Sequence, residues 1–171
     1  MIGHYVRRFF TSLSRRPPLS ADAIWAESLV SPAAYALFAR LSDTDRRHLV
    51  QSARLAAAEL PADADRVWVQ AALLHDVGKF DADLGVFGRV AATVAATAVG
   101  NARVRGWAGR PGWRGRLGTY QCHDDIGADE IRAAGGPEEA ALWSELHHHP
   151  DQFADATIAP PVLRVLDAAD H

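Results

Sequence analysis

The sequence contains few residues that could cross-link the chain or carry it through a membrane. Cys122 is the only cysteine among 171 residues, so no internal disulfide can form. It has no CxxC partner, and we expect a small, half-buried side chain in a reducing compartment, hence a cytoplasmic protein. No segment reaches the about 18 consecutive apolar residues that a membrane-spanning helix needs. The net charge of −3 gives no global basic field, so we predict no nucleic-acid partner.

Lysine is almost absent as well. Lys79 is the only lysine among eighteen basic residues, and all the others are arginine. It ends the stretch Leu-Leu-His-Asp-Val-Gly-Lys at residues 73–79, three positions after the pair His75-Asp76. A compact ammonium group suits a phosphate oxygen or a polarised water. The motif therefore indicates metal-assisted chemistry on a small phosphorylated substrate.

Strand-like alternation is also missing, and apolar residues recur at helical spacing. We predict an all-α fold, a bundle of about six to eight helices separated by proline and glycine. Ser31 and Ser42 are expected N-caps, and Gly135-Gly136 an expected C-terminal stop. The segment 103–118 is expected to be a loop or a broken helix. Helices are predicted at about 32–41, 43–60, 63–76, 90–99, 120–134, 137–149 and 162–170.

The helices are expected to form one domain at 31–171, with an Arg/Gly-rich insertion at about 84–119. Residues 1–30 are expected to be an N-terminal arm or helix that packs on the body or leaves it. The arm carries a basic and aromatic run, Tyr-Val-Arg-Arg-Phe-Phe at 5–10, which is too short for a signal-peptide core. A surface helix or frayed arm is the favoured interpretation, and weak contact with a membrane surface is the alternative.

Histidines and aspartates on the predicted helices are candidate metal ligands. Imidazole and carboxylate without thiolate are typical of Mn, Fe, Ni, Co, Zn or Mg sites rather than of a structural zinc finger. A bundle can direct one side chain from each helix to a common centre, so one or two divalent ions per chain are expected. Asp124 and Asp125 are expected to be solvated. The candidate ligands are His48, His75, Asp76, His123, His147, His148 and Asp170.

The order of these residues resembles the pattern H…HD…H…H…D of the HD-domain metal-dependent phosphohydrolase superfamily. Residues 72–79 are similar to its central motif, and 165–170 to its closing Ala-Asp helix. His-Asp-Asp-Ile-Gly-Ala at 123–128 resembles the H-x-x-x-G-A segment of the branch that includes bacterial HD-type diadenosine tetraphosphate hydrolases. The resemblance covers about residues 44–170, and the arm and the Arg-rich stretch lie outside it.

The resemblance implies an HD-domain bundle that hydrolyses a nucleotide or another small phosphoester or phosphoanhydride. His48, His75, Asp76 and Asp170 would hold a first ion, which turns water into hydroxide at neutral pH. Asp76 would bridge to a second ion, held also by His123 and by His147 or His148. Lys79 would then act beside Asp76 in catalysis, by stabilising negative charge.

Two ligand assignments stay open in the sequence. The motif H-H-x-P favours His147, with His148 close behind. The apolar positions three, six and seven places earlier favour His149, counting back to Leu146, Trp143 and Leu142. Asp167 lies one turn before Asp170 and is its alternative. The substrate, the metal and the oligomeric state stay open as well.

The insertion is rich in arginine. Between Leu84 and Gln121 there is no acidic residue, and two tryptophans are interleaved. Arg110 and Arg114 are predicted to bind substrate phosphates bidentately. The alternatives are a solvated loop, or a surface that touches anionic lipid. The six arginines are Arg89, Arg103, Arg105, Arg110, Arg114 and Arg116.

Two other functional classes compete with a hydrolase. One is a non-catalytic HD-like module that senses a nucleotide or a metal. The other is a peripheral membrane or scaffold protein. The complete ligand set favours the hydrolase, because a scaffold has no need of it.

Overall fold

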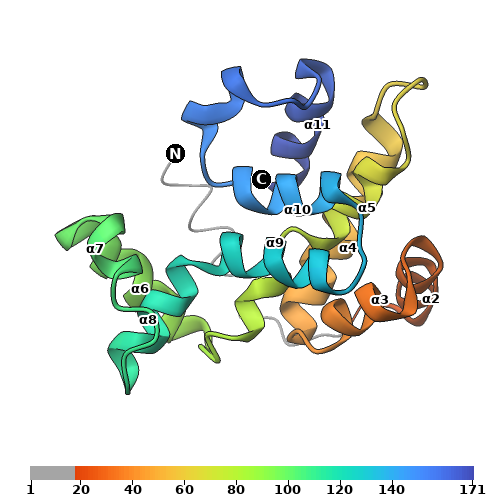
Figure 1. Cartoon of the computed structure of the whole chain (residues 1–171). Coiled ribbons are helices and arrows are strands. Elements are labelled where there is room, and N and C mark those ends of the chain that lie inside the picture. The colour runs from red at the N-terminus through yellow and green to blue at the C-terminus, as the bar shows by residue number, and fades with distance from the viewer. Residues whose placement is uncertain (1–17) are drawn as a thin grey trace.

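The computed structural model describes residues 18–171, where all regular structure is helical and no strand occurs (Figure 1). The prediction of an all-α fold is confirmed. The aromatic run at 5–10 lies outside the described residues. No helix in 18–171 has the length and apolar character needed to cross a membrane. The helices are α2 (Ser20–Leu29), α3 (Pro32–Ala39), α4 (Asp43–Glu59), α5 (Val67–Leu74), η1 (Val77–Phe80), α6 (Val86–Val99), α7 (Asn101–Arg105), α8 (Trp113–Gln121), α9 (His123–Ala133), α10 (Glu138–Leu146), η2 (Pro150–Asp155) and α11 (Pro160–Asp170).

Local signals set most of these boundaries. The Ser31 side chain accepts a hydrogen bond from the Ala34 amide at the start of α3, and Ser42 caps α4 in the same way. After α9, Gly135 has a φ of +66°, and the Gly136 amide donates to the Ile131 carbonyl at 2.8 Å. This is a Schellman ending, which glycine adopts without steric cost. The predicted caps are confirmed.

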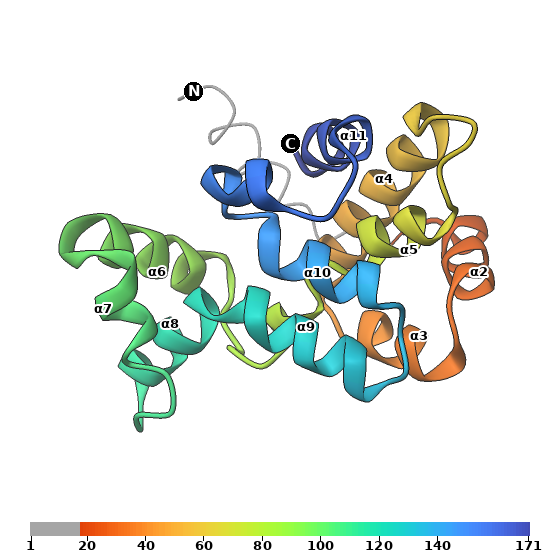
Figure 2. The ribbon, with the colours of Figure 1, turned by 45° about the horizontal axis from the view of Figure 1, so that its top comes forward.

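A main body forms around α4, α5, α9, α10 and α11 (Figures 1 and 2). α10 packs between α5 and α9, and α4 packs on α5 and α11. The core of the body is filled by fully buried large side chains such as Phe38, Leu49, Leu73, Trp143 and Leu166. α2 also belongs to the body, because Ala26 lies in the same core. The packing therefore holds α4, α5, α9, α10 and α11 at fixed positions around one centre.

The Arg-rich stretch folds as a lobe of its own, made of α6, α7 and α8 at residues 86–121. It lies to one side of the body (Figures 1 and 2) and has a small separate core of Ala92, Val104 and Leu117. The stretch predicted to be a loop or broken helix contains α7 and the start of α8. The helix predicted at about 120–134 is present as α9 over 123–133, but its start differs, because the helical path breaks at Cys122, where φ is −105° and ψ is 10°.

Two glycines allow the backbone to pass close to itself beside the His-Asp pair. η1 crosses α9 so closely that a Cβ on Gly78 would lie 2.2 Å from the His123 carbonyl oxygen and 2.6 Å from the Gly127 amide nitrogen. A Cβ on Gly127 would meet the Ser144 hydroxyl at 2.8 Å. Only glycine fits at this crossing, which brings the segment after Asp76 against the start of α9.

We expect Gly78→Ala to lower the free energy of unfolding by about 1–3 kcal/mol or more, because two backbone segments must separate. Gly85→Ala is the matched control, since its φ is −70° and a methyl group there would have no atom within 4 Å. Urea denaturation of both variants measures the effect. Equal midpoints for the two variants would show that the crossing tolerates a methyl group.

Candidate metal centre

Seven side chains from five helices, or from the turns that end them, meet in the body. α4 supplies one histidine, and α11 supplies an aspartate at its last residue. The His-Asp pair stands where α5 gives way to η1, one histidine begins α9, and two follow α10. The first and last members of the group, His48 and Asp170, are 122 residues apart in the chain. Its members are His48, His75, Asp76, His123, His147, His148 and Asp170.

Asp76 divides these side chains into two groups. Its Oδ2 faces the first group, 3.6 Å from His75 Nε2 and 4.0 Å from His48 Nε2. Both of these nitrogens lie 3.1 Å from Asp170 Oδ1. Its Oδ1 faces the second group, 3.3 Å from the Nε2 atoms of both His123 and His147. Atoms that share one ion at about 2.1 Å lie about 3–3.5 Å apart. The contacts of Asp76 Oδ1 and of Asp170 Oδ1 have this spacing, whereas the 3.6 and 4.0 Å separations from Asp76 Oδ2 are wider.

The second group includes a further histidine. His148 Nε2 lies 3.1 Å from His123 Nε2, and donor atoms of Asp76, His123, His147 and His148 all lie within 4.8 Å of one another. His48, His75 and Asp76 meet the same criterion on the other side. Either group of histidines, together with the buried aspartate, could hold a metal ion.

Backbone carbonyls orient the buried imidazoles. Nδ1 of His75 lies 3.0 Å from the Ala72 carbonyl, and the equivalent nitrogens of His123 and His147 contact carbonyls three residues earlier, at 2.6 and 2.7 Å. A carbonyl only accepts, so Nδ1 carries the proton and donates it. In the neutral ring each Nε2 then presents a lone pair to the centre, which is the tautomer that a metal ligand requires. When protonated, His75 Nε2 can instead donate to Asp170 Oδ1, 3.1 Å away.

Two buried acceptors face each other without a hydrogen bond. Asp76 Oδ1 and His147 Nε2 are both shielded from solvent, and neither has a hydrogen-bond partner among the described residues. Two acceptors 3.3 Å apart repel unless a cation or a proton lies between them. The donor set thus fits a divalent cation on the Oδ1 side of Asp76.

Charge states at the centre suit cation binding. Burial raises the pKa of Asp76, but Lys79 and His75 outweigh burial and hold the pKa well below its usual value. Burial also raises the pKa of Asp170, but His75 and His48 outweigh it and hold the pKa of that carboxyl well below its usual value. Desolvation lowers the pKa of His123. At neutral pH the carboxylates are therefore ionised and this imidazole is neutral.

His148 lies at the edge of the second group. The residue as a whole is exposed, yet its ring is packed against His123 and His147. Desolvation of the ring, together with the neighbouring His147, His123 and Lys79, strongly lowers the pKa of His148. A neutral ring at this edge can present its nitrogen to an ion while part of it faces solvent.

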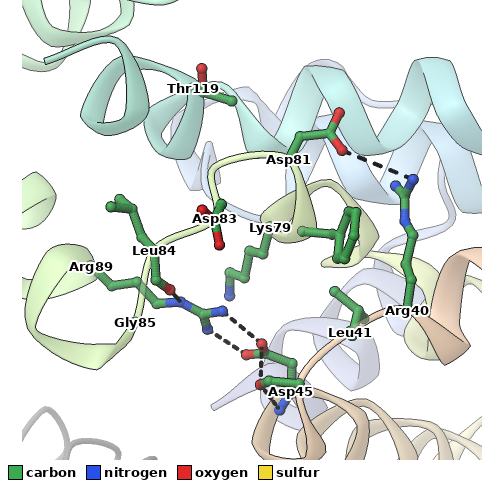
Figure 3. Close-up of a pocket in the computed structure, with 12 residues that line it drawn as sticks. Arg40, Leu41, Asp45, Lys79, Asp81, Asp83, Leu84, Gly85, Arg89 and Thr119 are labelled. Carbon is green, nitrogen blue, oxygen red and sulfur yellow. Dashed lines mark hydrogen bonds and ion pairs between the residues drawn. The ribbon is translucent and has the colours of Figure 1, made fainter. Parts of the chain in front are cut away.

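Lys79 connects the centre to an open pocket. Its ammonium group contacts Asp76 Oδ2 directly, and the side chain is buried. It also lines a pocket of about 770 Å³ between α4, η1 and α6 (Figure 3). Arg89 reaches the pocket from α6, held on Asp45 at 2.7 Å, and the Arg40 guanidinium lies 4.7 Å from the centroid of the Phe80 ring. The pocket therefore combines three cations and three aspartates, Asp45, Asp81 and Asp83, with an exposed aromatic ring.

Some candidates lie elsewhere. His149 leaves the cluster because the residue before Pro150 is turned out of the helix, and its Nε2 contacts Asp124 Oδ2 at 3.2 Å. Asp167 is half exposed and lies 3.8 Å from His171. The prediction that Asp124 is solvated is wrong: the residue is buried and paired with Arg105 at 2.9 Å.

The predicted substrate arginines are not at the pocket. Arg110 and Arg114 are exposed on the lobe and do not line it. The pocket contains two residues that the sequence does not single out, Arg89 and Asp45. Only the short spacing between Asp45 and His48 points to Asp45, and nothing local distinguishes Arg89 from the other arginines.

Comparison with models of known protein families gave no match. Comparisons with curated proteins and with solved structures gave none either. The chemistry of the centre therefore rests on its own residues.

A bound cation at a hundred times its Kd stabilises a fold by about 2.7 kcal/mol. We expect Mn²⁺ or Zn²⁺ to raise the thermal midpoint of the protein, and EDTA to reverse the rise. His147→Gln should reduce both this shift and the metal content, because its Nε2 faces Asp76. His149→Gln, two residues away, should keep both. Equal shifts in the two variants would mean that the cluster is not the binding site.

Proposed function

We propose that the protein is a metal-dependent phosphohydrolase of the HD-domain type. One observation carries the proposal: the two oxygens of Asp76 face two separate groups of imidazoles, and Lys79 joins the same carboxylate to an open pocket. A carboxylate placed in this way can be shared by two ions. The order of the ligands along the chain, with its resemblance to the HD-domain pattern, gives independent support.

The residues of the centre would form two sets of metal ligands. His48, His75 and Asp170 would share one ion with Asp76 Oδ2, and His123, His147 and His148 another with Oδ1. Divalent ions held in this way lower the pKa of a bound water, so that hydroxide is available near neutral pH. The reaction proposed is hydrolysis: water adds to phosphorus, the bond from phosphorus to the leaving oxygen breaks, and that oxygen takes up the proton.

The chain's own cations act on the substrate side. The Lys79 ammonium group lies at the boundary between Asp76 and the pocket, where it can neutralise charge on a phosphate oxygen. Arg89 is held in place by two contacts to Asp45, so its guanidinium is positioned before substrate arrives. The Phe80 ring, 47% exposed, offers a flat apolar surface for the organic part of a nucleotide or another small phosphoester.

A second candidate is a non-catalytic module that senses a nucleotide or a metal. The contact between Lys79 and Asp76 Oδ2 favours it, because the ammonium group competes for the oxygen that faces the first group. Such a module would bind metal and nucleotide without releasing product. Product release under metal-loaded conditions separates the two functions.

We expect the metal-loaded protein to release phosphate or a nucleoside phosphate from a panel of nucleotides and small phosphoesters. Mn²⁺, Fe²⁺, Co²⁺, Ni²⁺, Zn²⁺ and Mg²⁺ should be tested in turn. Asp170→Asn should abolish turnover, because Asp170 touches both His48 and His75. Asp167→Asn, one turn earlier and outside the centre, should leave it unchanged. Metal binding with no turnover by the wild type would favour the sensor.

Lys79→Ala should keep its metal and lose about 10²–10³-fold in kcat, the usual loss when one group that stabilises the transition state is removed. Lys79→Arg should recover part of the rate, since the charge remains while the geometry changes. Metal content and kcat are measured on the same samples. An unchanged kcat in Lys79→Ala would remove the lysine from the mechanism.

A further inference from the structure

The arginines of the lobe fall into two sets of three. One set ties the lobe to acidic residues outside it: Arg89 contacts Asp45 at 2.7 Å, Arg105 contacts Asp124 at 2.9 Å, and Arg116 contacts Asp83 at 3.0 Å. These pairs use three arginines against carboxylates of the body and of the turn before α6. The other three arginines take no part in attaching the lobe through ion pairs.

The other set points outward. Arg103, Arg110 and Arg114 are exposed, and none of them forms an ion pair with a carboxylate in residues 18–171. Arg114 lies 5.8 and 5.9 Å from the centroids of Trp107 and Trp113. No acidic residue occurs between Leu84 and Gln121, although the whole chain has a net charge of −3. The lobe is therefore a positive end on an otherwise acidic molecule.

α6 adds an exposed apolar face to this positive lobe. Phe87 is 79% exposed, Val94 61% and Val90 43%. Their spacing of three, four and seven residues puts them on one side of the helix, whereas Ala92 on the other side packs into the small core. Trp113, at the start of α8, is 65% exposed. Apolar side chains that are exposed together on one side of a helix indicate a binding surface.

We propose that the lobe docks on the surface of an anionic lipid bilayer. A 14-residue helix with an apolar face, on the same lobe as three exposed arginines and an exposed tryptophan, has the composition of a segment that lies in the membrane interface. A second copy of the chain fits less well, because pairing two such faces would bring two sets of arginines together. A nucleic acid would use the arginines but would leave Phe87 and Val94 in water.

Docking would use the side of α6 that faces away from the pocket of the centre. Gly85 and Arg89 line that pocket, and Phe87 lies between them in the sequence on the outer side of α6. Docking needs only the surface of the lobe, so it does not depend on hydrolysis at the centre.

The test is sedimentation of the full chain with vesicles. We expect binding to vesicles of phosphatidylglycerol mixed with phosphatidylcholine, and little binding to phosphatidylcholine alone. The double variant Phe87→Asp/Val94→Asp should bind about tenfold or more weakly. Replacing Arg103 or Arg110 by alanine should each cost about fivefold, and binding should weaken as salt is added. Ile24→Asp, an equally exposed apolar site on α2, and Arg164→Ala on α11 are the matched controls and should bind as the wild type does.

Three results would overturn the proposal. The first is absence of binding to the anionic vesicles by a folded wild type, judged by circular dichroism. The second is binding that Ile24→Asp weakens as much as the α6 variant does. The third is a concentration-dependent dimer that Phe87→Asp/Val94→Asp dissociates, which would assign the face to a second copy. Variants that retain the wild-type helical spectrum and thermal midpoint keep each comparison valid.

Discussion

The centre of this protein depends on the buried carboxylate of Asp76. A carboxylate removed from water is costly unless its charge is compensated from every side. Here one oxygen meets Lys79 and the first group of imidazoles, and the other meets the second group. Five helices, or the turns that end them, bring side chains to Asp76. The packing of the body therefore also places the groups that compensate the charge of this carboxylate. Lys79 supplies the fixed positive charge, and the imidazoles supply lone pairs that suit cations.

The geometry around Asp76 is set largely by the backbone. The glycine crossing at Gly78 and Gly127 lets η1 approach α9 more closely than any side chain would allow. Ser144 lies within hydrogen-bond distance of the carbonyls of His75 and Asp124, so α10 is tied to both segments that carry ligands. The imidazoles of His75, His123 and His147 are each oriented by a carbonyl of their own turn. The ligand atoms are thereby arranged before any ion binds, and little reorganisation is needed.

The lobe shows how one residue type can serve two purposes. Three arginines form pairs that hold the lobe against the rest of the chain, and two of the paired carboxylates, Asp45 and Asp124, adjoin the pocket and the metal centre. The other three arginines carry charge outward. The lobe is therefore attached at the edge of the centre, and the orientation of α6 affects both the pocket wall and the outer apolar face.

The sequence by itself determined the elements and the set of candidate ligands. Caps at Ser31 and Ser42, the stop at Gly135 and the apolar spacing act within a few residues, so most helices could be placed from the sequence alone. The order of the histidines and aspartates likewise identified the seven side chains that meet. Their roles as ligands remain predictions, and so does the hydrolase activity.

Only the tertiary structure decided which neighbours among similar residues face the centre. The turn before Pro150 sends His147 toward Asp76 and His149 toward Asp124, a difference that helical periodicity does not contain. Arg89 lines the pocket while Arg110 and Arg114 do not, because the pairing of Arg89 with Asp45 joins positions 44 residues apart. Such choices depend on how helices pack, and packing energy is shared among residues that are distant in the chain. Local sequence thus supplied the chemical groups available to this protein, and the fold selected which of them meet.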